Sequence, residues 1–343
     1  MSAAGTQVVK PGTPGTDVAI TPGTDVAIAA AGASMSKANM SGAMMRWANL
    51  GGADLSEANL SKADASGAVL AGADLHLANF TRADLRWANL GDANLNSTDF
   101  TRADMTGSVL VGADMRKANF TRTKLGKADF STPSSDETPA DQAKEGTAGA
   151  KVSDLSDAMF VRADLTGANL SNSLLARTKF SRAVLVGADL RNARLLGVVA
   201  SGANFKGADL SDADMTGATF AGVNLAGANL AGANLSGVNL CGANLTGADL
   251  TGANVTGANL TKATLTGAKL SGVNLLSANL TGADLSQASL LGEPPLLESL
   301  SDANEIESGR PAVIRTPGDE PRPAITGSAS GTQPKQADQK LAS

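Results

Sequence analysis

The chain of 343 residues has little of what an ordinary globular core is built from. It contains one cysteine, one histidine, no tyrosine, eight phenylalanines and two tryptophans. The single cysteine, Cys241, excludes an internal disulfide framework and fits a reducing compartment. So few aromatic residues exclude a conventional core anchored by large rings. A chain that is 42% apolar is nevertheless not a disordered one, so we look for a repeat.

Long apolar runs are also missing. The longest run near the amino terminus, residues 26–33, falls far short of the 18 or more apolar residues of a membrane span. Residues 1–10 lack the apolar segment of a secretion signal. We therefore expect no membrane span and a cytoplasmic protein.

The residues that carry most enzyme chemistry are scarce. His76 is the only histidine, and no histidine or cysteine cluster has the spacing of metal ligands. Aspartate and asparagine are common, but they recur as letters of a repeat, so carboxylate pairs are expected without any catalytic role. We predict no enzyme activity, no catalytic residues, no metal and no cofactor.

Charge is balanced along most of the chain. The net charge is −5, yet residues 33–132 hold 11 Lys/Arg against 10 Asp/Glu, and residues 153–292 hold 9 against 9. The excess of negative charge lies in the first 32 residues, in 133–152 and in the tail. Because a nucleic-acid-binding protein needs a strongly basic surface, we do not expect a nucleic-acid partner.

What the sequence does have is a period of five. Every fifth residue from Met35 to Phe130, and again from Leu155 to Leu290, is Leu, Met, Phe, Val or Ala, which makes 48 units. Two positions earlier stands Ala in 38 of the 48 units, and Asn or Asp stands between them in 33. The repeating phrase is A-(N/D)-L-x-x, as in residues 243–247.

A helix cannot bury this pattern, because five residues advance 500° and successive leucines would wind around the helix. On an extended strand, Ala and Leu two residues apart point to the same side. The two following residues, which are often Gly, Ser or Thr, suit a turn. The pattern therefore predicts a coil of short parallel strands with Ala and Leu inside.

These 48 units resemble the pentapeptide-repeat family, and the resemblance covers about 240 residues. It implies an all-β fold, a right-handed quadrilateral parallel β-helix with four units, or 20 residues, in each coil. About 12 coils would form a rod of about 58 Å at the usual strand spacing. The phenylalanines support a 20-residue coil independently, since six of the eight lie at multiples of twenty.

The five-residue frame predicts how the chain is divided into coils and connecting segments. We expect five coils in 33–130 and seven coils in 153–292, separated by 131–152, which abandons the pattern and contains Pro133 and Pro139. Because removing twenty residues there restores both the five-residue frame and the phenylalanine period, we favour one solenoid with an extruded, disordered loop over two solenoids.

Both ends of such a rod need a cover, since an open coil exposes unpaired backbone and leucines. We expect residues 1–32 to be a flexible head whose last apolar run caps the first coil. Residues 293–308 are expected to form a capping helix, which could instead join two copies into a homodimer, and 309–343 to be a disordered tail.

Two outward aromatic residues are the strongest candidate site. Arg46-Trp47 and Arg86-Trp87 begin the same five-residue phrase forty residues apart, which places them two coils apart on one corner, with Gly67 between. Tryptophan and arginine are favoured interface anchors, so we predict that this corner binds a partner. The alternative is that the indoles pack on neighbouring turns or lie under the head.

A basic ladder is the second candidate. One cation recurs every coil, at Lys62, Arg82, Arg102, Arg122, Arg162 and Arg182. The ladder could hold an extended anion. A carboxylate follows two residues later in four of these units, at Asp64, Asp84, Asp104 and Asp164. We therefore favour a solvated lattice of ion pairs.

The leading function is a non-enzymatic scaffold or protein-binding rod, with another protein of unknown identity as partner. The alternative comes from the quinolone-resistance branch of the family, whose members imitate DNA and bind DNA gyrase. A short acidic column, Asp54, Asp74 and Asp114, is what this alternative could use.

Overall fold

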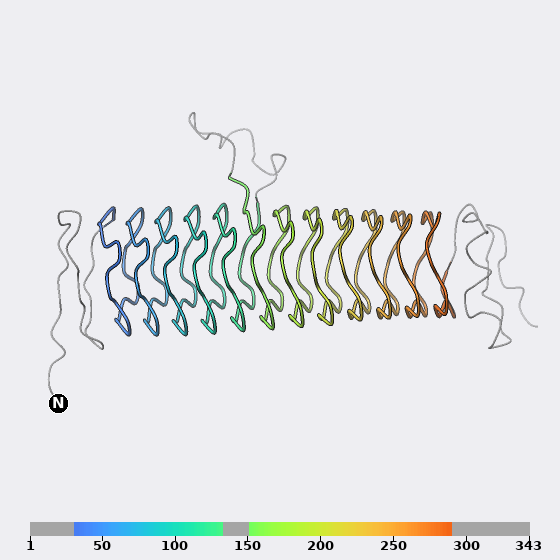
Figure 1. The fold of residues 1–343 in the computed structure, drawn as a ribbon, viewed down its shortest axis with the longest axis horizontal. Coiled ribbons are helices and arrows are strands. Elements are labelled where there is room, and N and C mark those ends of the chain that lie inside the picture. The colour runs from blue at the N-terminus through green and yellow to red at the C-terminus, as the bar shows by residue number, and fades with distance from the viewer. Residues whose placement is uncertain (1–30, 133–150, 290–343) are drawn as a thin grey trace, which may run out of the picture.

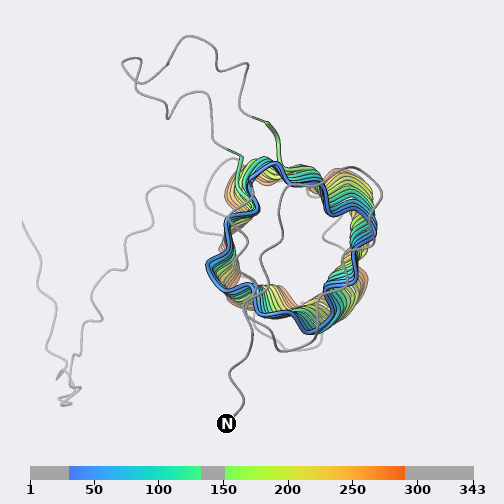
Figure 2. The same cartoon turned by 90° about the vertical axis from the view of Figure 1, so that its left-hand side faces the viewer.

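The computed structural model describes residues 31–132 and 151–289, and they form one elongated coil of backbone (Figure 1). Within these residues there is no helix and no strand longer than a single bridged residue. Parallel bridges occur at the Asn/Asp position of the unit and join residue i to residue i+20, beginning with Ser34 and Asp54. Four bridge positions follow one another in each coil, so the coil has four sides, seen end-on in Figure 2.

Hydrogen bonds between coils hold each unit at three points. Leu50 N donates to Val69 O at 2.7 Å, Gly52 N to Ala71 O at 2.8 Å, and Asp54 N to Ala33 O at 2.9 Å. A fourth bond closes the corner, from Ala53 N to Leu50 O at 3.0 Å. Nearly every backbone group thereby finds a partner in the next or previous coil. The short units therefore satisfy their backbone hydrogen bonds without forming longer strands.

The inner positions are filled as the repeat predicts. The Ala and Leu side chains at the two inward positions of the described units are all buried, with exposures of at most 7%. Phe80, Phe100, Phe120, Phe160 and Phe180 form one stack with centroid distances of 4.6–5.3 Å. Ala200 ends the stack, and Phe205 on the next side packs edge-on against Phe180 at 6.3 Å. The expected phenylalanine ladder is therefore present.

The two described segments pair directly with each other. Asp114 bridges to Asp154 and Asp129 to Asn169, an interval of forty instead of twenty. Ser153 closes the junction: its Oγ donates to Ser131 O at 3.1 Å and accepts Gly112 N at 2.9 Å. The bridge ladder therefore continues without a break across 133–150. The predictions for the head, for 133–150, for 290–292, for the helix at 293–308 and for the tail lie outside the described residues.

Candidate functional site

Each corner of the coil is built around a residue in the left-handed backbone region. This residue is the last of the A-(N/D)-L-x-x phrase, directly before the next inward Ala position, and φ lies near +60° there even for large side chains such as Trp47 and Arg102. The left-handed region strains residues with a β-carbon, which is why glycine is common at this position. A side chain placed there stands on the outer rim of the rod. The corners therefore carry the side chains that are available to contact a partner or a ligand.

The Asn/Asp position has a local role that sequence reasoning missed. Its Oδ1 accepts the backbone N–H two residues later, as Asn79 does from Thr81 at 2.9 Å. When a Ser or Thr follows, its hydroxyl donates to the same oxygen, as Thr251 does to Asp249 at 2.6 Å. This Asx turn fixes the approach to the corner, and the spacing of Asn/Asp from the turn was the signal that could have revealed it.

The tryptophan corner carries Arg46, Trp47, Arg86 and Trp87. Trp47 is 73% exposed and Trp87 is 59% exposed. Each indole nevertheless leans over the glycine of the next coil: a β-carbon built at Gly67 would lie 2.3 Å from Trp47 Cε3, and one at Gly107 would lie 2.8 Å from Trp87 Cδ1. One side of each ring is thus supported by the rod while most of its surface faces solvent.

The two arginines of this corner are engaged with carboxylates. Arg86 Nε donates to Asp84 Oδ1 at 2.9 Å, and its guanidinium carbon lies 5.4 Å from the centroid of Trp87. The hydrogen bond from Arg86 is the main cause that lowers the pKa of the Asp84 carboxyl below its ordinary value. Arg46 Nε lies 3.6 Å from Asp64 Oδ2. The pair with Asp84 thus holds the Arg86 guanidinium beside the Trp87 ring.

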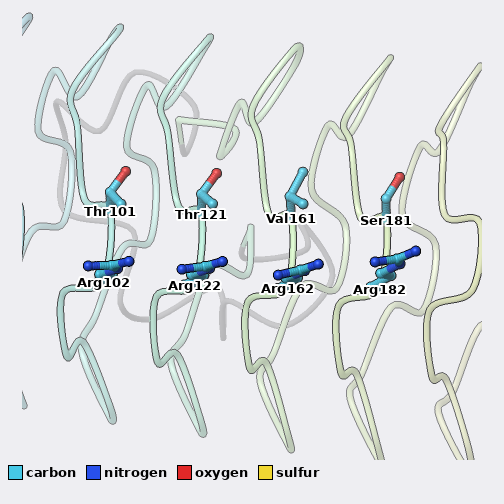
Figure 3. Close-up of a pocket in the computed structure, with 8 residues that line it drawn as sticks. All are labelled: Thr101, Arg102, Thr121, Arg122, Val161, Arg162, Ser181 and Arg182. Atoms are coloured by element: carbon cyan, nitrogen blue, oxygen red, sulfur yellow. The ribbon is translucent and has the colours of Figure 1, made fainter.

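The basic column consists of the six ladder residues Lys62, Arg82, Arg102, Arg122, Arg162 and Arg182, all exposed and one per coil. Figure 3 shows the last four as a single row of guanidinium groups. Thr101, Thr121, Val161 and Ser181 precede these arginines and line a shallow groove of about 440 Å³ with them. We call this groove, with its four arginines, the column groove.

The expected ion-pair lattice on this column is wrong. None of its six cations has a carboxylate within 4.0 Å among the described residues. The expected partners pair elsewhere: Asp64 with Arg46, Asp84 with Arg86, and Asp104 with Lys124. The reason is geometric, because the left-handed corner residue leans away from its own unit toward the next coil: a β-carbon built at Gly202 would lie 3.9 Å from Arg182 Cγ.

The carboxylates of the acidic column are already engaged by neighbouring side chains. Asp74 accepts from Asn94 Nδ2 at 2.9 Å and lies 2.9 Å from His76 Nδ1. Arg116 Nε donates to Asp114 Oδ1 at 2.8 Å and lies 3.9 Å from Asp154 Oδ2. The hydrogen bond from Arg116 lowers the pKa of Asp114. The column is therefore an alternation of carboxylates, an amide and a shared cation.

No metal centre emerges from the geometry. In residues 31–132 and 151–289, no three His, Cys, Asp or Glu side chains are grouped so that they could hold an ion. Cys241 stands at an outward, half-buried position, where its N–H donates to Asn239 Oδ1 at 3.1 Å. Over the same residues, no helix is long and apolar enough to cross a membrane.

Comparison with known proteins identifies the repeat. The family described as pentapeptide repeats matches the chain in eight copies, over residues 30–56, 58–96, 93–131, 158–197, 183–222, 218–257 and 258–290. No curated protein matches the chain.

Several solved structures resemble it. HetL, described as involved in heterocyst differentiation regulation in the cyanobacterium Nostoc sp. strain PCC 7120, is 32% identical over 67% of this chain and 89% of HetL, with a TM-score of 0.31. QnrB1, described as a plasmid-mediated fluoroquinolone resistance protein, is 19% identical over 57% of this chain and 91% of its own, with a TM-score of 0.32. Rfr23 from the cyanobacterium Cyanothece 51142 is 28% identical over 52% of this chain and 89% of its own, with a TM-score of 0.20.

Proposed function

The chain belongs to the pentapeptide-repeat family, and we propose that it works as a non-enzymatic rod that binds another protein through the tryptophan corner. Proteins of this family are right-handed quadrilateral β-helices. The proposed rod has about 12 coils, a length of about 58 Å and a cytoplasmic location. A long, regular surface of this kind suits a scaffold, because its side chains stand at fixed intervals along an axis.

The observation that carries this proposal is the exposure of Trp47 and Trp87 on one corner, at 73% and 59%. Singly exposed apolar side chains are normal on protein surfaces, but two tryptophans on one corner gather a large apolar area, and tryptophan is enriched among the residues that dominate binding at interfaces. Contact with Gly67 and Gly107 restricts the indoles before any partner arrives. Less side-chain entropy is then lost on binding, which favours association.

The lining of the rod supports a binding role over catalysis. The inner positions of the described coils are filled by Ala, Leu, Met, Phe and Val with a few Ser and Thr, and the charged groups lie on a convex outer surface. A substrate site needs a concave pocket in which acids, bases and nucleophiles converge. We therefore propose no reaction, metal or cofactor for this chain.

Imitation of DNA is the alternative, and the geometry speaks against it. A mimic needs a dense surface of one sign, whereas Arg116 touches both Asp114 and Asp154, and Asn94 interrupts the column. We therefore propose the tryptophan corner, and not the acidic column, as the surface that selects a partner.

The test is a comparison of two matched double variants. Trp47→Ser/Trp87→Ser removes both indoles of the tryptophan corner. Serine is tolerated at such a position, since Ser97 already has a left-handed backbone. Leu77→Ser/Leu276→Ser removes two other exposed apolar side chains, which are 56% and 53% exposed. The wild-type protein and both variants are used for affinity capture from the native cell, and captured proteins are purified and titrated against each form.

We expect one protein to bind the wild type and the leucine variant and to lose affinity for the tryptophan variant by at least about 30-fold, as for a hot spot worth about 2 kcal/mol. Both variants should melt within a few degrees of the wild type. Equal binding by all three forms would refute the corner as the binding surface.

A further inference from the structure

The basic column differs from the corner that precedes it in the chain, where the charges are paired. At that corner Lys37 lies 3.7 Å from Glu57 of the next coil, and Arg177 Nε donates to Asp157 of the previous coil at 2.8 Å. Cation and anion thus alternate along that corner. The basic column has six cations in succession and no anion among them, and glycines at 42 and 202 bound it.

Coils about 4.8 Å apart place these like charges at the spacing of neighbouring strands. Exposed like charges at that distance repel one another, and among the described residues no carboxylate lies within 4.0 Å of any of the six cations. Such a row of unpaired cations, one per coil, matches a linear anion. Hydroxyls of Thr121 and Ser181 line the column groove beside the arginines and add neutral donors for anionic oxygens (Figure 3), whereas the Thr101 hydroxyl already donates to Asp99 Oδ1 at 2.6 Å.

The neighbouring columns restrict how wide the anion can be. On one side of the basic column lie Asp64, Asp84, Asp104 and Asp164. The first three are paired with Arg46, Arg86 and Lys124, so an anion that spreads in that direction gains little attraction there. The tryptophan corner lies beyond these carboxylates, so its indoles cannot serve as stacking platforms for bases bound along the groove. Binding of single-stranded nucleic acid combines a basic groove with aromatic platforms, and the groove lining has no aromatic residue.

Charge spacing along the ligand also matters. On an extended acidic peptide, side chains on one face repeat every ~6.8 Å, so they fall out of step with coils spaced about 4.8 Å apart. In an unbranched phosphate chain, neighbouring phosphates share a bridging oxygen, and each carries a negative charge. Every guanidinium then finds oxygens within reach in any register, and bidentate contact with phosphate suits arginine.

We propose that the column groove binds linear inorganic polyphosphate, which lies along Arg102, Arg122, Arg162 and Arg182 with its axis parallel to the rod. The site is separate from the tryptophan corner and does not depend on the proposed protein partner. Lys62 and Arg82 extend it by two coils for longer chains.

The proposal is tested with end-labelled polyphosphate of a single chain length, titrated against the purified full chain and followed by fluorescence anisotropy. Arg122→Gly/Arg162→Gly removes two central cations and introduces the residue that this corner already has at Gly202 and Gly222. Arg116→Gln/Arg177→Gln is the matched control, since it removes the same charge from arginines that are already paired with Asp114 and Asp157.

Each phosphate contact contributes a slope of about −0.7 to the dependence of log K on log salt for a single-stranded polyanion. Loss of two contacts should lower the magnitude of the slope by about 1.4 and weaken binding about 25-fold at roughly 0.1 M salt. The control should change affinity by less than about threefold, because its two cations are neutralised by their partners.

Two competitors decide the class of ligand. Oligothymidylate and polyglutamate of equal charge should displace the labelled polyphosphate only at much higher concentration. Absence of binding at low salt, equal weakening by both double variants, or displacement by either competitor at equal concentration would each overturn the proposal. Circular dichroism of each variant, identical to that of the wild type, establishes that the rod is folded in every titration.

Discussion

The indole of Trp47 lies directly over Gly67, the corresponding corner residue of the next coil. A β-carbon built on Gly67 would stand 2.3 Å from both Cε3 and Cζ3 of the indole, well inside van der Waals contact. Glycine is therefore required at position 67 for two reasons: its φ is +66°, and the indole occupies the space that a β-carbon would need. Gly72 has the same φ of +66° but nothing within 4 Å of such a β-carbon.

This difference makes Gly67→Ala and Gly72→Ala a matched pair. Both variants should lose about 1–2 kcal/mol from left-handed strain. Gly67→Ala should lose more and should also displace the indole, which thermal unfolding and the accessibility of Trp47 to iodide quenching in a Trp87→Phe background will report.

The double variant Trp47→Ser/Gly67→Ala removes the collision and keeps the strain. We expect it to show the smaller loss seen for Gly72→Ala. If Gly67→Ala and Gly72→Ala lower the melting temperature equally and leave iodide quenching unchanged, then Trp47 does not rest on Gly67.

The pentapeptide phrase predicted the core because inward and outward positions are separated by strand geometry alone. Leu50 and Ala53 had to be inside once the unit was extended, and they are. The stack from Phe80 to Phe180 followed from the same arithmetic. What the phrase could not predict is the direction in which a corner side chain leans. That direction depends on a positive φ, which is a property of the closed turn and not of the letters.

The misassigned ion pairs at the basic column follow from this. Arg82 and Asp84 are two residues apart, and on a strand they would share a face. Arg82 itself has a left-handed backbone, with φ of 62°, which directs its side chain away from Asp84, and Asp84 pairs with Arg86. The tryptophans were expected either to be exposed or to pack on neighbouring turns. The indoles do both, because a ring large enough to reach the next coil still keeps an open face.

A second prediction concerns a buried hydroxyl. Ser108 occupies the inward alanine position, is fully buried, and its Oγ has no hydrogen-bond partner. Ser108→Ala restores the usual residue of the repeat and should raise the free energy of unfolding by about 1 kcal/mol, because a buried donor no longer lacks a partner.

Ser173→Ala is the control at the same position of another unit. Its Oγ donates to Leu170 O at 2.6 Å, so this variant should lose about 0.5–1.5 kcal/mol. Thermal unfolding followed by circular dichroism measures both. A loss of stability in Ser108→Ala equal to that in Ser173→Ala would show that the Ser108 hydroxyl does have a partner.

A third prediction is the acid response of the rod. The hydrogen bond from Lys269 Nζ, at 2.9 Å, is the main cause that lowers the pKa of Asp249 from 3.8 to about 2. A carboxyl whose pKa is depressed by folding stabilises the folded state above its unfolded pKa, and this contribution disappears as pH falls through the folded pKa. The melting temperature should therefore be level above about pH 4 and fall between about pH 4 and 2.

Asp249→Asn should make that fall shallower while it keeps the Asx turn, since an amide Oδ1 can accept the N–H of Thr251 as the carboxylate does at 3.0 Å. Lys269→Gln should have the same effect, because it removes the cation responsible for the shift. Melting curves recorded across this pH range test both variants, and an unchanged slope in either would contradict the assignment.

The last prediction is that this protein does not protect DNA gyrase. Duplex DNA carries about one negative charge per 1.7 Å, so a mimic about 58 Å long would need about thirty or more carboxylates of one sign. The repeat units hold 19 Asp/Glu and 20 Lys/Arg, and the basic column occupies one whole corner over six coils. Arg116 further joins Asp114 to Asp154 in the one column that could serve. In a supercoiling assay with purified gyrase and a fluoroquinolone, titration of this protein should neither restore nor inhibit activity, while a pentapeptide-repeat protein of established quinolone resistance serves as positive control. Protection at low micromolar concentration that disappears in Asp54→Asn/Asp74→Asn/Asp114→Asn would replace the tryptophan corner by the acidic column as the functional surface, because only a charge-based contact would be sensitive to those three changes.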